Sequence, residues 1–447
     1  MKDLTTGKPL KVIIMFAIPI ILGSIFQQFY NIADSKIVSE FVGTDAFAAV
    51  GATSVISNTI IAFINGLTQG FAIPTATSFG AKEYKKMRKF IAGTIVLTMM
   101  ITVLLTGAAL YFVSDILVVL KTPADIFDNA IAYVRIILVG TIFSSVYNMC
   151  ANTLRAVGDS KTPLYCLIGG VLVNVGMDFL FVGGLKLGIK GAAYATLISQ
   201  CCCAAACLMF FIAKFRELLP KREEWKPEKA LYVNLATTGF AMGFMTCIVN
   251  LGTVVLQSAI NGLGTTVVAA HTAARRVFDI LCVSLYCIGI SMTTYVSQNI
   301  GAGRNDRVKK GVVTAIGMVT VISTVLLVVC FVFGERVFRW LASSDDEALI
   351  GYAVMYSRIS IVFFYALGPL FILRSSLQGL GKRIIPIVSS VMEMAVKIIS
   401  ANFLVPIFGY TGVAFTEPVS WVLMTIVLLI AFFSCKIESI QPNIGEA

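Results

Sequence analysis

Charged residues are scarce in this chain of 447 residues. Asp, Glu, Lys and Arg make up 13% of it, against about 25% in a typical soluble domain, and hydrophobic residues make up 57%. So few charges cannot cover the surface of a soluble protein of this size. The composition therefore excludes a cytosolic enzyme, a disordered protein and a secreted disulfide scaffold.

The residues and motifs of common catalytic sites are also missing. A single histidine, His271, excludes an HExxH zinc site. The eleven cysteines include no CxxC pair, and most lie inside apolar runs, where they are better interpreted as small apolar helix residues than as metal ligands. No GxSxG or P-loop sequence occurs, and no GxGD of an intramembrane aspartyl protease precedes Asp178. We therefore do not expect an enzyme.

Long apolar runs fill the sequence instead. A helix that crosses a bilayer core of about 30 Å needs about 20 apolar residues, and continuous rather than alternating runs argue against a β-barrel. The sequence therefore predicts an all-α membrane protein with twelve transmembrane helices, over residues 10–33, 46–79, 90–114, 127–153, 163–184, 190–213, 233–260, 266–300, 310–334, 347–376, 384–406 and 411–434.

Lysine and arginine give the chain a formal net charge of +11. Most of them form short clusters between apolar runs, as in cytoplasmic loops, so the charge does not indicate nucleic-acid binding. When the loops alternate between the two sides of a membrane, the side of the N-terminus collects 24 of these residues, the other side 6, and five lie within spans. This bias predicts that both termini are cytoplasmic.

The longest polar segment, residues 215–229, divides the spans into two sets of six. We predict an N-terminal six-helix bundle over 1–214, a cytoplasmic linker loop over 215–229 and a C-terminal six-helix bundle over 230–447.

The two halves also share short stretches in the same order, at offsets of 221 to 223 residues. The matches are Gly43–Ala49 with Gly264–Ala270, Gly80–Lys82 with Gly301–Gly303, Tyr133–Ile136 with Tyr356–Ile359, and Gly158 and Pro163 with Gly381 and Pro386. They indicate an internal repeat. Because six is an even number, both halves start on the same side, and we expect a pseudo-two-fold axis along the membrane normal and a central cleft.

Two acids of the first half lie inside apolar spans, where an acid costs about 2.5–3.5 kcal/mol on insertion scales. Tyr30 lies one turn before Asp34, and Asn174 lies one turn before Asp178. The tyrosine can donate a hydrogen bond, and two carboxylates could share a proton or a cation. The alternative is that each acid faces water at the end of its span. Pro19 can kink the first span and move Asp34.

The acids of the second half have simpler interpretations. Asp279 follows Arg275 by four residues, so we expect an ion pair within one helix. Glu393 and Lys397 have the same spacing, and form either a structural pair or the counterpart of the first-half polar face. Glu417 precedes a proline, so we expect it to bond to freed backbone groups.

Several of these features occur together in one known family. They are two sets of six spans, Pro19 with Asp34, the stretch LRAVGDSKTP at Leu154–Pro163, the pair Asn174 and Asp178, and KGAAYAT at Lys190–Thr196. In this order and spacing they resemble the multidrug and toxic compound extrusion (MATE) transporters over nearly the whole chain. The resemblance implies export of organic cations and amphipathic compounds in exchange for H⁺ or Na⁺ by alternating access, with no other cofactor.

The resemblance also implies which residues bind the coupling ion. In the branch that this chain most resembles, a first-half cluster binds it, and by position that cluster is Tyr30, Asp34, Asn174, Asp178 and Thr196. An asparagine of the fourth span joins it, and either Asn152 or Asn148 matches. Na⁺ as the coupling ion would be ligated by Asp34, Asp178 and Asn174.

A second branch places its ion-binding acids on the seventh and tenth spans. These spans have no central acid here, and Gln257 is the nearest polar residue, so a second ion site is not expected. Gln257, Glu393 and Lys397 are candidates for substrate binding. We expect Glu417→Gln to reduce ion-coupled efflux much less than Asp34→Asn or Asp178→Asn.

Two alternatives to an exporter remain. A flippase for a lipid-linked precursor would favour a cationic cavity, which Arg135, Arg358 and Lys397 could line, whereas the acids suit cations. A non-transporting receptor would not explain the repeat. We expect small-molecule drugs, mainly organic cations, as substrates of a monomer among the lipids of the cell inner (plasma) membrane, with no nucleic-acid partner.

Overall fold

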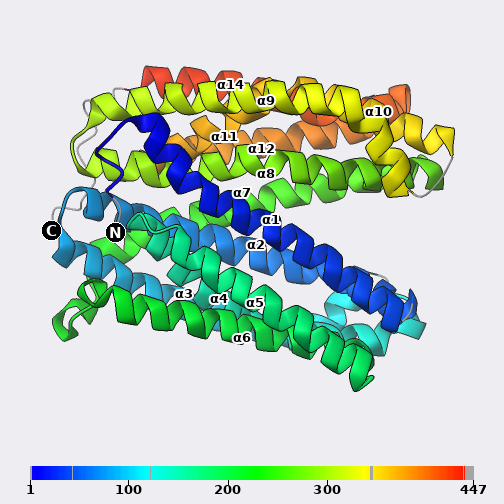
Figure 1. The fold of residues 1–447 in the computed structure, drawn as a ribbon, viewed down its shortest axis with the longest axis horizontal. Helices are drawn as coiled ribbons and strands as arrows, with labels where there is room; N and C mark the ends of the chain where they lie inside the picture. Colours follow the sequence, from blue (N-terminus) through cyan, green and yellow to red (C-terminus); the bar gives the residue numbers. More distant parts are fainter. Residues whose placement is uncertain (1–2, 43, 121, 343–345, 436, 438–447) are drawn as a thin grey trace. The chain divides into compact units, whose positions relative to one another are not determined.

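The computed structural model describes residues 3–437 except 43, 121, 343–345 and 436, and this part of the chain is almost entirely helical (Figure 1). The α-helices are α1 (Pro9–Phe41), α2 (Thr44–Gly80), α3 (Tyr84–Val119), α4 (Ala124–Ala156), α5 (Lys161–Asp178), α6 (Gly188–Lys214), α7 (Lys229–Asn261), α8 (Thr265–Gly301), α9 (Asn305–Ala342), α10 (Glu347–Val362), α11 (Phe364–Gly379), α12 (Ile384–Ile399), α13 (Val405–Phe408) and α14 (Tyr410–Ser434). Two π-helical segments, η1 (Phe179–Gly184) and η4 (Ser400–Leu404), continue α5 and α12, and the short 3₁₀ helices η2 (Arg216–Leu218) and η3 (Arg222–Trp225) lie before α7.

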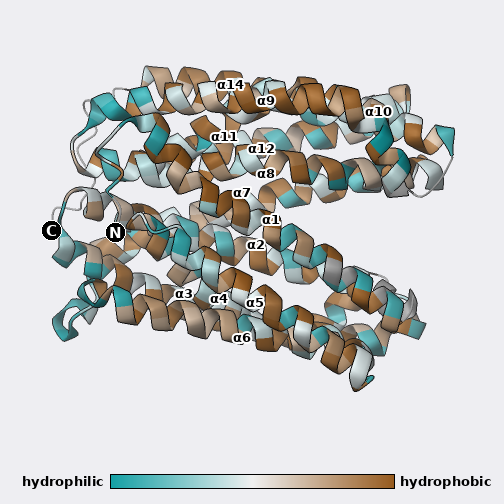
Figure 2. Cartoon of the chain, viewed as in Figure 1, coloured by the Kyte–Doolittle hydropathy of each residue, from teal (hydrophilic) through white to brown (hydrophobic). Residues whose placement is uncertain are grey.

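The predicted spans correspond to these helices. In the described part of the chain, eleven helical segments are long and apolar enough to cross a membrane, and the bent pair α10 and α11 makes a twelfth. Hydrophobic residues run along the lengths of the helices in Figure 2. The prediction of an all-α membrane protein with twelve transmembrane helices is confirmed.

The tenth span, predicted as one continuous helix over 347–376, is bent by 54° between α10 and α11. Pro369 lies in the second turn of α11, where it has no N–H for the preceding turn and its ring crowds that turn's carbonyl. Other helices supply donors to carbonyls beside the break. Ser323 Oγ donates to Phe364 O at 3.4 Å, and Thr425 Oγ1 donates to Ala366 O at 2.9 Å. These hydroxyls satisfy backbone groups that have no water partner in a bilayer.

The helices pack into two compact units. Unit 1 consists mainly of Ile18–Gly243, and unit 2 of Leu4–Ala17 and Phe244–Asn443. The helices α1 and α7 contribute residues to both units, so this division passes through two helices. The domain limits predicted from the linker, 214 and 230, stay a prediction.

The internal repeat is visible in the backbone itself. Three loops of the first half contain a residue with positive φ whose counterpart, at offset 221 or 223, also has positive φ: Lys82 (59°) with Gly303 (69°), Gly158 (84°) with Gly381 (74°), and Gly188 (63°) with Gly409 (57°). The π-helical segments η1 and η4 also begin 221 residues apart. These matches confirm the repeat. The first predicted match begins at Gly43, which lies outside the described residues.

The loop between α4 and α5 shows how the LRAVGDSKTP stretch folds. Gly158 has a positive φ at the end of α4, and the side chain of Asp159 then bonds to the first turn of α5. The Asp159 carboxylate accepts hydrogen bonds from the backbone N–H of Thr162 at 3.1 Å and from its hydroxyl at 2.7 Å, and it pairs with Lys214 Nζ at 3.1 Å. Although partial burial opposes ionisation, these bonds hold the pKa of Asp159 below its usual value.

The linker before α7 is held against α3 by an ion pair. Glu224 on η3 is almost fully buried, and its carboxylate accepts three hydrogen bonds of 2.8–2.9 Å from Arg88 and one of 2.8 Å from the N–H of Lys221. These bonds, those from Arg88 above all, lower the pKa of Glu224. Lys89 and Glu228 form a second ion pair beside it.

The substitution Glu224→Gln should release the linker from α3. The neutral amide loses the hydrogen bonds between charged groups that join Glu224 to Arg88, and such a bond contributes about 1.5–3 kcal/mol to stability. At neutral pH, trypsin should cleave the linker faster in this variant, whereas the exposed neighbour change Glu223→Gln should have no effect. Since the folded pKa lies below the ordinary value of about 4.3, the pair stabilises the linker above that pH and weakens as the pH falls through the folded pKa. A spin label at Lys226 should become more mobile over that range. Equal cleavage of both variants would contradict this role.

Candidate functional site

Two acids of unit 1 lie close to each other between the packed helices. Asp34 lies on α1, and Asp178 is the last residue of α5 and has no exposed surface. Their carboxyl groups lie within hydrogen-bonding range of each other. Among the described residues, no donor reaches Oδ1 of Asp34 or either oxygen of Asp178. A bond between two carboxyl groups requires that one of them carry a proton.

The other residues of the predicted cluster lie around this pair. Asn174 is 1% exposed, and neither its amide nitrogen nor its oxygen has a hydrogen-bond partner among the described residues. The hydroxyl of Tyr30 on α1 lies within hydrogen-bonding range of Thr196 on α6, and it interacts with both acids. The structure therefore brings Tyr30, Asp34, Asp178 and Thr196 together, and Asn174 lies one turn before Asp178. Their role in ion binding stays a prediction.

Tyr133 on α4 also faces the two acids, and the sequence analysis did not assign it to the site. Its hydroxyl interacts electrostatically with Asp34 and Asp178. A signal was present, because Tyr133 belongs to one of the repeated stretches and matches Tyr356 of the second half. A tyrosine that recurs inside a span indicates a polar partner nearby.

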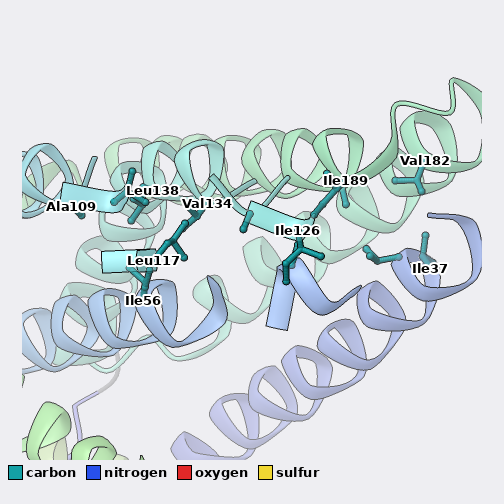
Figure 3. Packing of buried hydrophobic residues seen from close by; sticks show 14 residues of the cluster. Ile37, Ile56, Ala109, Leu117, Ile126, Val134, Leu138, Val182 and Ile189 are labelled. Carbon is teal, nitrogen blue, oxygen red and sulfur yellow. The ribbon is translucent and has the colours of Figure 1, made fainter. Parts of the chain in front are cut away.

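A hydrophobic cluster fixes the helices that carry the site (Figure 3). Each site helix contributes a buried residue within one turn of its polar side chain: Val38 on α1, Val134 on α4, Val182 on η1 and Ala192 on α6. Packed apolar side chains interdigitate with few voids and so fix the positions of the helices that carry them. The polar residues are therefore held in position by apolar neighbours, which need no hydrogen-bond partners of their own.

The backbone changes its hydrogen bonding directly after Asp178. The π-helical segment η1 begins at the next residue, and one of its bonds runs from the N–H of Leu185 to Leu180 O at 2.8 Å. Such segments are rare and occur frequently at functional sites. Here η1 continues the span while shifting the phase of the helix beyond Asp178.

This cluster is suited to binding a proton or one small cation. Two adjoining carboxylates repel each other in a medium of low dielectric constant, and a proton or a cation between them removes that cost. No group of three His, Cys, Asp or Glu residues comes together as a metal site in the described chain. Na⁺ would therefore need neutral oxygens from Asn174, Thr196 or Tyr30 beside the two carboxylates.

Two further predicted residues lie elsewhere. Asn152 donates to Thr68 Oγ1 at 3.0 Å and accepts from Arg155 at 3.1 Å, in the last two turns of α4, so the structure does not bring it to the acids. Gln257 donates to Asn261 Oδ1 at 2.9 Å near the end of α7. Among the described residues, it forms no hydrogen bond with Glu393 or Lys397.

Unit 2 contains a charged network around Glu417 instead of an unpartnered pair. Arg275 Nη1 donates to the two carboxylate oxygens of Glu417 at 2.8 and 2.9 Å, and Tyr356 donates to it at 3.1 Å. The predicted pair of Arg275 with Asp279 is confirmed at 3.1 Å. The expectation that Glu417 bonds to backbone freed by Pro418 was wrong. A charged partner on α8 outcompetes a neutral backbone group for a buried carboxylate.

The predicted pair of Glu393 and Lys397 on α12 is confirmed at 3.1 Å and belongs to the same network. Lys397 is 2% exposed and also contacts Glu417 at 3.7 Å and Thr253 Oγ1 at 3.1 Å. Arg374 on α11 pairs with Glu393 at 3.4 Å. Three cations thus face three acids, and the network carries no net formal charge.

Comparisons with known proteins agree with this fold. The family model MatE matches residues 19–180 and 241–404. The probable multidrug resistance protein YpnP of Bacillus subtilis (strain 168) is 30% identical over 383 residues, which are 85% of this chain and 84% of that protein. The FAD transporter of Shewanella oneidensis is 22% identical over 343 residues, which are 76% of this chain and 75% of that protein.

Solved structures show the same architecture. An outward-facing multidrug resistance MATE family transporter of the MOP superfamily superimposes with a TM-score of 0.90 over 98% of each chain, at 21% sequence identity. The agreement extends over both halves of the repeat.

Proposed function

The chain belongs to the MatE family of membrane transporters, and from this premise we propose that it exports bulky organic cations in exchange for H⁺ or Na⁺. It is a transporter and not an enzyme, and its relatives include multidrug export proteins. In this proposal the coupling ion binds at Asp34 and Asp178.

The observation that supports this proposal is a buried acid pair in which Oδ1 of Asp34 and both oxygens of Asp178 have no donor among the described residues. A transporter that exchanges one cation for another needs a site whose charge changes during the cycle. The carboxyl groups of Asp34 and Asp178 can be neutralised by a proton or a cation and can return to the ionised form. A cationic drug favours the ionised form, so drug and coupling ion compete, directly or through the conformational equilibrium.

The substrate class follows from the charge and the rings at this site. Ionised carboxylates attract cations, and the rings of Tyr30 and Tyr133 add cation–π attraction for quaternary or aromatic cations. A bulky cation without polar groups forms few directional hydrogen bonds with this site. We therefore expect modest affinities and a broad range of substrates.

Transport of an anionic compound is the second candidate. It is favoured by the similarity to an FAD transporter and by the cations Arg275, Arg374 and Lys397 within the spans of unit 2. However, each of these side chains already pairs with a carboxylate, which leaves little free positive charge for a phosphate. The flippase alternative loses the free positive charge of Lys397 for the same reason.

Efflux from proteoliposomes tests the proposal. A fluorescent organic cation is loaded, and a Na⁺ or an H⁺ gradient is imposed separately. The expected result is efflux driven by one of these gradients and absent from liposomes without protein. Transport confined to an anionic nucleotide or an anionic lipid precursor would support the second candidate instead.

Location in the cell membrane with both termini in the cytoplasm is part of the proposal. It is supported by the distribution of Lys and Arg, 24 on one side against 6 on the other. A cysteine introduced at Arg222, in a background without reactive cysteines, should react with a membrane-impermeant reagent only after the cells are opened. Labelling of intact cells would reverse the orientation.

A further inference from the structure

The polar clusters of the two units occupy corresponding places in the repeat. At the offsets set by the matching loops, Tyr133 corresponds to Tyr356, Asn174 to Lys397 and Thr196 to Glu417. The second-half residues contact one another, as Tyr356 and Lys397 both reach Glu417, at 3.1 and 3.7 Å. The network of unit 2 is therefore the structural counterpart of the proposed ion site of unit 1.

The two places differ in what neutralises the acids. In unit 1, Asn174 lies one turn before Asp178 on α5, and its amide is neutral and has no partner among the described residues. In unit 2, the position of that asparagine holds Lys397, whose ammonium group lies beside carboxylates. An ammonium group has about the charge and the hydrogen-bonding demand of a small hydrated cation.

The surroundings of Lys397 satisfy that demand. Its Nζ lies 3.1 Å from Thr253 Oγ1, 3.1 Å from Glu393 Oε1 and 3.7 Å from Glu417 Oε1, so oxygens from α7, α12 and α14 surround it. The side chain is 2% exposed. Two of these oxygens, on Thr253 and Glu393, accept hydrogen bonds from the ammonium, and the carboxylate of Glu417 adds negative charge beside it.

We propose that the Lys397 ammonium is a resident cation that permanently fills the unit 2 counterpart of the coupling-ion site. The oxygens of Thr253, Glu393 and Glu417 form a latent site for a monovalent cation, which is free to bind one only when the ammonium is removed. This inference rests on the proposed function of the acid pair in unit 1. It assigns a single exchangeable cation to each transporter molecule.

Removing the ammonium tests the latent site directly. In Lys397→Ala, the network retains two cations against three acids, and the vacated position is surrounded by oxygens. All variants carry Asp178→Asn as well, so that cation binding in unit 1 does not contribute. Thermal unfolding is measured in detergent with NH₄Cl, NaCl or N-methylglucamine chloride at equal ionic strength.

The expected result is that NH₄⁺ or Na⁺, but not N-methylglucamine, raises the unfolding temperature of Lys397→Ala, and that the rise follows the logarithm of the cation concentration. The matched control is Glu393→Gln combined with Lys397→Ala, which restores charge balance and should lose the response. Lys397→Asn, which introduces the residue of the corresponding position in unit 1, serves as a second variant and should respond as Lys397→Ala does.

Three outcomes would overturn the proposal. The first is that the unfolding temperature of Lys397→Ala is the same with every cation, and the second is that the charge-balanced control responds as strongly as Lys397→Ala. The third outcome is that both Lys397 variants fail to fold and NH₄⁺ does not restore folded protein to either of them. The proposed function is judged separately, by whether Asp178→Asn abolishes efflux when Lys397 is intact. An active Asp178→Asn protein would refute the function of unit 1 without changing the cation response of Lys397→Ala.

Discussion

Asp34→Asn and Asp178→Asn should each reduce gradient-driven efflux of a fluorescent cation to the background of empty liposomes. Asparagine has nearly the shape of the protonated acid, so each variant should remain folded in the membrane. Asparagine cannot ionise, however, so the site loses the change of charge that couples the ion to the drug. Efflux rates in proteoliposomes under the gradient that drives the unmodified protein measure the effect.

The control for this prediction is Asp115→Asn. Asp115 also lies on a span of unit 1, but its side chain is exposed and lies outside the acid pair. This variant should retain efflux at equal protein abundance. Normal ion-coupled efflux by either Asp34→Asn or Asp178→Asn would remove that acid from the mechanism.

Glu417→Gln should destabilise the protein strongly, by about 3–5 kcal/mol, which is the usual cost of breaking a buried ion pair by removing one partner. The amide leaves Arg275 and Lys397 facing too little negative charge, in a place where Glu417 is 5% exposed. The expected readouts are a lower yield of folded protein and a lower unfolding temperature.

A second substitution separates this cause from general damage. Glu417→Gln combined with Lys397→Met restores the balance between cations and acids, and it should recover part of the stability lost in the single variant. If the double variant is no more stable than the single one, charge imbalance is not the cause. An unfolding temperature of Glu417→Gln equal to that of the unmodified protein would contradict the network's role.

Most of the fold was predictable because a bilayer imposes one solution on long apolar runs. Each predicted span matches a helix or a pair of helical segments, and the repeated loops recur because a backbone with positive φ is restrictive. The acid pair was predictable for a related reason. Asp34 and Asp178 stood out because each is a costly residue inside an apolar run.

The sequence could not reveal which distant partners meet. Nothing local to Glu417 indicates Arg275, which is 142 residues away and lies on another helix. Proximity in the sequence suggested Pro418 instead, and that expectation was wrong. The contact between Arg374 and Glu393, the bend before Pro369 and the approach of Tyr133 to the acids are likewise set by helix packing. Such contacts can be identified only from a structure that shows how the two helices pack.

Ion release on binding of an organic cation tests the central claim most directly. Purified protein in weakly buffered detergent solution is titrated with tetraphenylphosphonium while free H⁺ and Na⁺ are recorded. If the acid pair exchanges drug for coupling ion, the unmodified protein should release H⁺ or Na⁺ in proportion to the bound cation, and Asp178→Asn should release none. Equal release by the two proteins would contradict the assignment of the coupling ion to Asp34 and Asp178.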